Sequence, residues 1–301
     1  MPATTAAFSH LLAPGLRKVY FDNLKKFEEE YSKIANVHSS TRAYEEDLMM
    51  AGLGRFLHKP EAEPLTYDTI YQGNKKRYTH KTFALGFAVS KEQYDDDLYG
   101  VFKKMSAALA KAAAQTVELE FAGLLDDAYT GGTYTGHDSK ALCATDHALT
   151  AGGTYANEPS TQVDLGIGAL RAASERMEKT VDERGLPANI GRGKLVVVTP
   201  TYQWVAKEIL GSEYKPYTAD NELNAFKDMG MSYMVSHYMS DDDMWFLLGD
   251  KDTHDINWFW REKPRFDNED DFATKTARFS GWMRFSLGFT DWRGVDGSSG
   301  G

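Results

Sequence analysis

The stretch "KTARFSGWMRFSLGFT" (275–290) alternates between two kinds of side chain for longer than an ordinary strand lasts. Because successive side chains point to opposite faces of a strand, it predicts a long antiparallel ribbon with one buried face. We expect "DINWFWRE" (255–262) as its partner, with "KPRFDNEDDFATK" (263–275) as the loop between them. The face predicted to be buried carries Ala277, Phe279, Gly281, Met283, Phe285, Leu287 and Phe289. The opposite face carries Thr276, Arg278, Ser280, Trp282, Arg284, Ser286 and Thr290.

A long helix is predicted over "FKKMSAALAKAAAQTVELEFAGLLDDA" (102–128), which is rich in the strongest helix formers. At 1.5 Å per residue it would span about 40 Å. Just before it, Ser90 and Gln93 have the spacing of a capping box and predict a helix start. The long helix could be the core helix of any large domain, but its place after a projecting hairpin favours a helix that supports the whole domain along its length.

That hairpin is "TYDTIYQGNKKRYTHKTFALGFAVS" (66–90), with the turn residues Gly73 and Asn74 between two strand-like runs. An isolated two-stranded ribbon is marginally stable in water. The tip should therefore rest on something, and a neighbouring subunit is the natural candidate. The alternative is an internal hairpin that packs on its own sheet.

One charged group lies within this hairpin and another follows it in the sequence. The basic group, expected near its tip, comprises Lys75, Lys76, Arg77, His80 and Lys81, and the acidic group, at a helix start, comprises Asp95, Asp96 and Asp97. One interpretation is two solvated charge runs. The sharper hypothesis is that the basic tip of one subunit meets the acidic group of its neighbour, which would set register and orientation more than affinity.

An α/β subdomain is expected between about 135 and 250. Apolar residues at helical spacing precede the strand "KLVVVT" (194–199), and a second helix begins at Pro200. The segment "MSYMVSHYMSDDDMWFLLGD" (231–250) resembles a strand, an acidic turn and another strand. The ending "GVDGSSGG" (294–301) is typical of a flexible tail.

Composition restricts the function classes. The 301 residues are 42% hydrophobic, which suits a folded domain with ample core. A net charge of -10 without a basic stretch argues against general nucleic-acid affinity. The single Cys143 excludes a disulfide framework and fits a reducing compartment. Neither a signal peptide nor a membrane span is evident.

The candidate chemical sites are weak. Cys143 and His147 lie close together in the sequence and suggest a cysteine nucleophile with a histidine base, or a metal site with nearby His137, Asp138 and Asp146. No recognised ligand spacing is present, and such residues arise easily by chance in a polar loop. Glycine pairs at 166 and 168 and at 191 and 193 lack the spacing of a dinucleotide or phosphate loop. Asp250, Asp252 and Asp255 lack the calcium-loop glycine. We therefore expect no catalytic residue, no metal and no cofactor.

The order of arm, hairpin, long helix, α/β subdomain and returning long strand resembles the major capsid proteins of tailed bacteriophages, which have the Hong Kong 97 fold. Four segments have an amino-acid sequence that resembles the Mu-like major head subunit group. They are "FALGFAVSKEQYDDDLYG" (83–100), "KALCATDHALTAGGTYAN" (140–157), "KLVVVTPTYQWVAKEIL" (194–210) and "FSLGFTDWRGV" (285–295). The resemblance implies an α+β fold. Its parts would be an N-terminal arm (1–60), an extended β-hairpin loop (61–90), a peripheral domain with the spine helix (91–133 and 251–295), an axial domain (134–250) and a tail (296–301).

The same resemblance implies a function. The chain would self-assemble into the hexamers and pentamers of an icosahedral shell around double-stranded phage DNA, held by confinement without sequence-specific binding. Expected partners are a scaffolding protein, a portal and a decoration protein, in a virion assembled in the host bacterial cytoplasm. Two rivals stay open at this point: a cellular compartment of the same fold that encloses cargo protein, and a hydrolase that uses Cys143 and His147.

Overall fold

The computed structural model describes residues 8–97, 100–216, 222–271, 274 and 276–301. The chain divides into two compact units, each assembled from segments far apart in the sequence. Unit 1 comprises 1–45, 79–121 and 258–287, and unit 2 comprises 46–78, 122–257 and 288–301. Each unit has its own sheet and its own apolar core.

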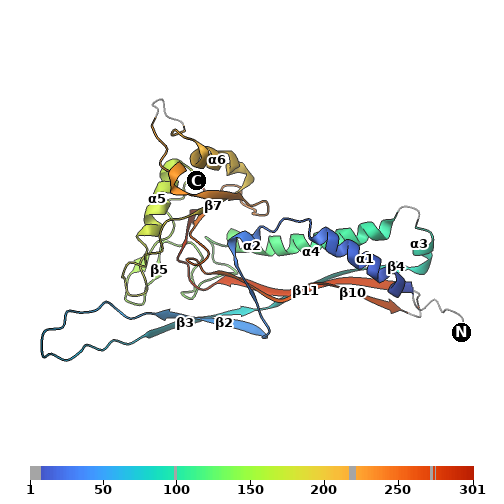
Figure 1. Ribbon diagram of the computed structural model, residues 1–301, viewed down its shortest axis with the longest axis horizontal. Helices are drawn as coiled ribbons and strands as arrows, with labels where there is room; N and C mark the ends of the chain where they lie inside the picture. Colours follow the sequence, from blue (N-terminus) through green and yellow to red (C-terminus); the bar gives the residue numbers. More distant parts are fainter. Residues whose placement is uncertain (1–7, 98–99, 217–221, 272–273, 275) are drawn as a thin grey trace. The chain divides into compact units, whose positions relative to one another are not determined.

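Unit 1 is a four-stranded sheet covered by helices (Figure 1). Its strand order is β1-β10-β11-β4. The strands are β1 (Asn36–Ser39), β4 (Lys81–Ser90), β10 (Ile256–Asp271) and β11 (Thr276–Phe289). The helices are α1 (Phe8–Leu24), α2 (Tyr31–Ile34), α3 (Lys91–Asp95) and α4 (Val101–Asp126), the last of which continues into unit 2.

The core of unit 1 lies between the sheet and the two longer helices. Leu16 and Tyr20 of α1 and Leu109 of α4 pack against Phe266 of β10 and Phe279 of β11. A second aromatic group fills the other end of the sheet, where the ring of Trp258 lies 4.4 Å from that of Phe285 and 4.6 Å from that of Tyr31, centroid to centroid. Apolar burial of this kind is the main stabilising contribution to the fold.

The long-helix prediction is confirmed, because α4 has 26 residues within one residue of the expected start. The cap at Ser90 is also confirmed: the Gln93 N–H donates to Ser90 Oγ (3.2 Å), and the Ser90 N–H donates to Gln93 Oε1 (3.4 Å). Sequence patterns that depend on neighbours three or four residues apart therefore predict this part of the chain well.

The long strand is confirmed as β11, with the predicted alternation up to Phe285. Beyond it, Ser286 and Leu287 are both buried, so the strand is enclosed on both faces at its end. The prediction of a loop over 263–275 is wrong, because β10 continues to Asp271. Its charged residues pair with one another at the surface, as Arg265 does with Asp267 (2.7 Å) and Glu262 (3.1 Å).

The hairpin prediction at Gly73–Asn74 is wrong. Both residues lie inside β3 (Tyr71–Thr79), which pairs with β2 (Tyr44–Ala51), whereas β4 pairs with β11 in the register Val89↔Ala277 to Lys81↔Phe285. The hairpin is therefore β2–β3, and residues from 44 onward that were expected in the N-terminal arm belong to it. Its chain reversal lies near Pro60–Glu63, where Ala62 has φ +65° and the Glu63 N–H faces the Pro60 carbonyl oxygen at 3.4 Å.

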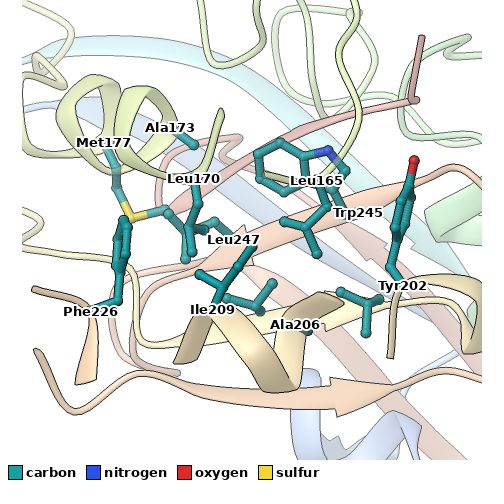
Figure 2. Close-up of a cluster of buried hydrophobic side chains, with 12 residues drawn as sticks. Leu165, Leu170, Ala173, Met177, Tyr202, Ala206, Ile209, Phe226, Trp245 and Leu247 are labelled. Carbon is teal, nitrogen blue, oxygen red and sulfur yellow. The ribbon is translucent and has the colours of Figure 1, made fainter. Parts of the chain in front are cut away.

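Besides this hairpin, unit 2 contains a mixed sheet of order β12-β9-β7-β8 and a two-stranded sheet of β5 and β6. The predicted helix–strand–helix order is confirmed. The elements are β5 (His147–Ala148), β6 (Thr154–Tyr155), α5 (Ile167–Glu178), β7 (Leu195–Val198), η2 (Pro200–Tyr202), α6 (Gln203–Gly211), η3 (Lys227–Met229), β8 (Ser232–Val235), β9 (Trp245–Leu248) and β12 (Val295–Ser298). Figure 2 shows how α5 and α6 pack their apolar faces on this sheet around Trp245 and Leu247.

The predicted flexible tail is wrong up to Ser298. Val295–Ser298 forms a fully buried strand that pairs with β9. Within it, Asp296 receives a two-point contact from the Arg176 guanidinium of α5, at 2.9 and 2.6 Å. Such a paired buried charge ties the last strand to the helix that covers it.

The start of α2 in unit 1 is held by one carboxylate. Glu118 of α4 accepts the backbone N–H groups of Glu30 and Tyr31, both at 3.0 Å. Burial raises the pKa of this carboxyl to about 7 even though the two N–H donors favour its charged form.

This pKa predicts a pH dependence. A carboxyl whose pKa is higher in the folded chain contributes stability that is fully present below its unfolded pKa and lost as pH rises toward 7. We therefore expect the free energy of unfolding of the natural chain, relative to Glu118→Gln, to increase as the pH falls from 8 to 5. Urea unfolding at several pH values measures it, with Glu120→Gln on the same helix as control; a constant difference would show an unperturbed carboxyl.

Candidate assembly interface

The β2–β3 hairpin forms a long arm, defined here as residues 44–79, within which 52–70 is a loop without strands or helices (Figure 1). Within β2–β3, Gly73 lies against the partner strand so closely that a Cβ there would sit 3.0 Å from the Met49 carbonyl oxygen. The glycine that resembled a turn residue thus permits close strand pairing.

The base of the arm is fixed to the rest of unit 2 by three side chains of β3. Tyr78 Oη hydrogen-bonds Thr290 Oγ1 at 2.5 Å, Asn74 Nδ2 donates to the His137 carbonyl oxygen at 3.1 Å, and Lys76 Nζ donates to Thr135 Oγ1 at 3.2 Å. Tyr78 is 2% exposed, and burial raises the pKa of its hydroxyl well above the ordinary value. These contacts hold the direction in which the arm leaves the body of unit 2.

Behind the base lies a buried ionic cluster. The Arg293 guanidinium contacts Glu183 Oε1 at 3.0 Å, and His137 Nε2 faces the same oxygen at 3.5 Å. His137 Nδ1 lies 2.9 Å from the Thr290 carbonyl oxygen, which can only accept. Burial opposes a charge on His137, but Glu183 and this carbonyl outweigh it and raise the His137 pKa. The cluster therefore joins Glu183 and Arg293 to His137, whose carbonyl oxygen accepts a hydrogen bond from Asn74 of the arm.

Farther out, the Asp68 carboxylate joins the two sides of the arm in a clasp that Arg184 completes. Arg184 Nη1 pairs with Asp68 Oδ2 at 2.7 Å, and the same oxygen accepts the Gly54 N–H at 2.8 Å. The Arg184 guanidinium also lies 5.1 Å from the centroid of the Tyr71 ring. Residues 55–67 lie beyond this clasp and are called the arm tip below.

The arm tip is exposed and carries large apolar side chains among charged ones. Every residue from 55 to 70 is exposed, including Phe56 (105%) and Tyr67 (90%). The large apolar residues exposed along the arm are Tyr44, Met50, Leu53, Phe56, Leu57, Leu65, Tyr67, Ile70 and Tyr71. Burying one such side chain is worth about 1.5–3 kcal/mol. Several large apolar side chains exposed in one segment are typical of a protein interaction surface.

The predicted basic residues are not at the arm tip. Lys75 is exposed on β3; Lys76 contacts Thr135; and Arg77 pairs with Glu46 across the hairpin at 2.6 Å. His80 is buried between Ser40 (3.1 Å) and Ser286 (3.0 Å), and Lys81 pairs with Glu120 at 3.6 Å. Burial, followed by the charge of Arg284, lowers the pKa of His80.

The acidic group is also divided. The Asp95 side chain lies outside the described residues, Asp96 is exposed, and Asp97 Oδ1 accepts the Val101 N–H at the start of α4 (3.0 Å). A contact between the basic and acidic groups of neighbouring copies stays a prediction.

Sequence reasoning missed the arm tip itself. The predicted boundary between the N-terminal arm (1–60) and the extended loop (61–90) divides the segment "RFLHKPEAEPLTY" (55–67), whose apolar residues have neither helical nor strand periodicity. The available signal was a set of large apolar side chains in a segment with no predicted element to bury them.

The Cys143 region contains a structural network. Cys143 is buried, and burial raises the pKa of its thiol well above the ordinary value, which is the opposite of an activated nucleophile. His147 hydrogen-bonds Asp138 (2.6 Å) and Asn157 (3.0 Å), and its ring stacks on Trp292 with centroids 4.3 Å apart. Asp146 pairs with Lys140 at the surface. Within the described residues, no group of three metal-ligating side chains is placed to hold an ion.

Across the described parts of the chain, no helix combines the length and the apolar character that a membrane crossing requires. No curated protein matches this sequence. Solved structures with the same fold include Microbacterium phage Oxtober96 (9% identity, 91% of this chain and 92% of that chain, TM-score 0.57) and the capsid of a native GTA particle (12%, 89% and 89%, 0.59). A virus-like particle from Pyrococcus furiosus is also similar (8%, 94% and 97%, 0.56).

These similarities confirm the predicted α+β fold of the Hong Kong 97 type, while the Mu-like subgroup stays a prediction. The family model described as phage capsid protein matches residues 73–295, which covers most of β3, both long strands and the α/β part of unit 2. The chain belongs to the phage capsid protein family.

Proposed function

We propose that this major capsid protein assembles through its arm into an icosahedral shell that encloses double-stranded DNA. The proposal depends on the arm tip, whose large apolar side chains are exposed and are not buried by the rest of their own chain. The role is mechanical and needs no catalytic group. Burial raises the pKa of the Cys143 thiol, which disfavours a nucleophile at that position. Obligate interfaces of this kind bury about 2,000–5,000 Å².

In this proposal α4 is the spine helix, and the peripheral domain comprises 91–133 and 251–295. The axial domain comprises 134–250. The extended loop is the arm at 44–79, in place of the predicted 61–90, because β2 and β3 are the strands that pair. The arm of one copy would overlap the next copy around a ring, and rings would join into a closed shell.

A scaffolding protein, a portal and a decoration protein are the further partners that we propose, with assembly in the host bacterial cytoplasm before the virion is released. The solved structures with this fold include a procapsid of bacteriophage JBD30 and a capsid of the same phage decorated with minor capsid protein trimers. The minor capsid protein trimers on that phage's capsid support a decoration protein here.

Electron microscopy of the purified chain, alone and with the products of its neighbouring genes, tests the proposal. We expect closed shells with packaged DNA when the partners are present. Shells that contain cargo protein and no DNA would instead favour a cellular compartment. Discrete monomers under every condition, with thiol-dependent turnover, would contradict both shell functions.

A smaller prediction concerns Lys75, the exposed residue of the basic group. Because Lys76 and Arg77 have partners in their own chain, Lys75→Glu isolates a contact with a neighbour. We expect an unchanged free energy of unfolding and a weakening of assembly by about 0–1 kcal/mol per contact, larger at low salt. Light scattering during assembly at several salt concentrations measures it, with Lys227→Glu as control. Identical curves for both variants would remove Lys75 from the interface.

A further inference from the structure

A concentrated positive charge lies on the helices of unit 1, in a chain whose net charge is -10. The segments 14–27 and 101–117 contain a single acidic residue, Asp22. They contain seven exposed cations, called the cationic face below: Arg17, Lys18, Lys25, Lys26, Lys103, Lys104 and Lys111. No other part of unit 1 combines so many cations with so few acids, since β10 alternates the two signs.

The apolar sides of α1 and α4 explain where these charges point. Leu16 and Tyr20 of α1, and Phe102 and Leu109 of α4, are buried in the core that covers the sheet. The two helices also touch directly, because Ser106 Oγ donates to the Leu16 carbonyl oxygen at 2.8 Å. The exposed cations therefore lie outside the sides of α1 and α4 that pack on the sheet.

The cations also repeat along each helix. Lys104 and Lys111 are seven residues apart, as are Lys18 and Lys25, so each pair shares one helical side and is separated by about 10 Å. This distance is close to the Debye length of about 10 Å at 0.1 M salt. The charges therefore act together on a nearby polyanion.

Unlike many cations of this chain, those of the cationic face have no ionic partner among the described residues. Many arginines and lysines elsewhere have a carboxylate partner, as Arg176 has in Asp296 and Arg184 has in Asp68. Among the described residues, the side chains of the cationic face make a hydrogen bond from Lys26 Nζ to Asn23 Oδ1 (3.3 Å) and a contact of the Arg17 guanidinium with the Phe21 ring. Seven exposed cations with a single exposed carboxylate among them, that of Asp22, repel one another, and an external anion would relieve that repulsion.

We propose that the cationic face contacts double-stranded DNA and is turned toward the interior of the shell. This inference rests on the proposed function, which supplies the DNA. A duplex carries one charge per about 1.7 Å of its axis, and lysines bind phosphates as point charges without reading bases. The acidic remainder of the chain repels DNA, so contact is confined to this face. Confinement is thus supplemented by a specific attachment surface.

A protein partner fits the cationic face less well. Protein interfaces centre on large apolar or aromatic anchors. Within segments 14–27 and 101–117, the described side chains offer only Val101 as an exposed large apolar residue, and small alanines lie between the lysines. An acidic polypeptide such as a scaffold is therefore the rival that the experiment must exclude.

The test uses the unassembled full-length chain and a fluorescent 30-base-pair duplex, with binding measured by anisotropy between 50 and 200 mM salt. The test variant carries Lys25→Gln, Lys26→Gln, Lys103→Gln and Lys104→Gln. The control variant carries the same charge change at exposed lysines elsewhere, as Lys179→Gln, Lys207→Gln, Lys227→Gln and Lys263→Gln. Circular dichroism confirms that both variants are folded.

We expect the slope of log affinity against log salt to fall by about 3 to 4 in the test variant, with affinity at 50 mM salt reduced more than about tenfold, and no change in the control. Equal binding by both variants would overturn the proposal. So would tighter binding of polyglutamate than of duplex at equal charge concentration, which would indicate an acidic polypeptide. Because binding is measured without shells, a chain that never forms shells would defeat the proposed function separately from this result.

Discussion

Replacing residues 55–67 by a short Gly-Ser turn is expected to abolish shell assembly while the subunit stays folded. The arm tip makes no contact that stabilises its own chain beyond the clasp at Arg184, since every residue from 55 to 70 is exposed. The replacement removes four large apolar side chains that we expect a neighbouring copy to bury. Burying each of them contributes about 1.5–3 kcal/mol to the free energy of association. Sedimentation and negative-stain microscopy measure assembly, and thermal unfolding of the unassembled chain measures stability.

Point substitutions in the arm tip separate apolar burial from loop length. Phe56→Ser with Leu57→Ser should reproduce most of the assembly defect, whereas Lys59→Gln with Glu61→Gln, in the same loop, should assemble normally. Shells of normal yield from the shortened chain would show that the arm tip is dispensable. A large fall in melting temperature would show that it packs on its own subunit.

The second large effect is expected at the buried ionic cluster. Arg293→Met should lower the free energy of unfolding by about 3–5 kcal/mol, because it leaves the Glu183 carboxylate buried without its guanidinium partner. Both side chains are less than a tenth exposed, and Arg293 also donates to the Val181 carbonyl oxygen at 2.7 Å. The damage would reach the arm, since His137 joins the cluster to its base.

A matched control exists in the same unit. Arg192 pairs with Glu178 at 2.8 Å, but both side chains are about half exposed, so Arg192→Met should cost under about 1 kcal/mol. Urea unfolding of the two variants gives the comparison. Equal costs would mean that the cluster near the arm base contributes no more than a surface pair.

The sequence predicted those elements whose signals are local. The capping box at Ser90, the helix α4 and the alternation of β11 all depend on neighbours a few residues apart, and all three are confirmed. Alternation failed only beyond Phe285, where burial on both faces removes the polar side that the pattern requires.

The hairpin error came from non-local pairing. Gly73 and Asn74 carry a strong turn signal, but which strands pair depends on β2 and β11, and β11 lies some 200 residues away in the sequence. The tail error has a similar cause. A Cβ on Gly297 would lie 2.5 Å from the Trp245 carbonyl oxygen, so the small residues of the last segment permit close packing of a strand and do not indicate flexibility.

The sequence predicted that an arm contacts a neighbouring copy, but it assigned the contact to the wrong residues. The sequence indicated an outstretched two-stranded arm that seeks a neighbour, yet it attributed the contact to charges at Lys75–Arg77. The structure places those charges on the arm base and apolar side chains on the arm tip. Periodicity cannot reveal such a tip, because an irregular loop has no period.

Radical footprinting of Phe56 and Tyr67 tests the central claim most directly. The two rings are labelled in the unassembled chain and in assembled shells, under the same dose. We expect both to be reactive in the free chain and strongly protected in the shell, because a sister copy supplies the surroundings that their own chain lacks. Equal reactivity in both states would contradict the account, since the arm tip would then remain in water after assembly.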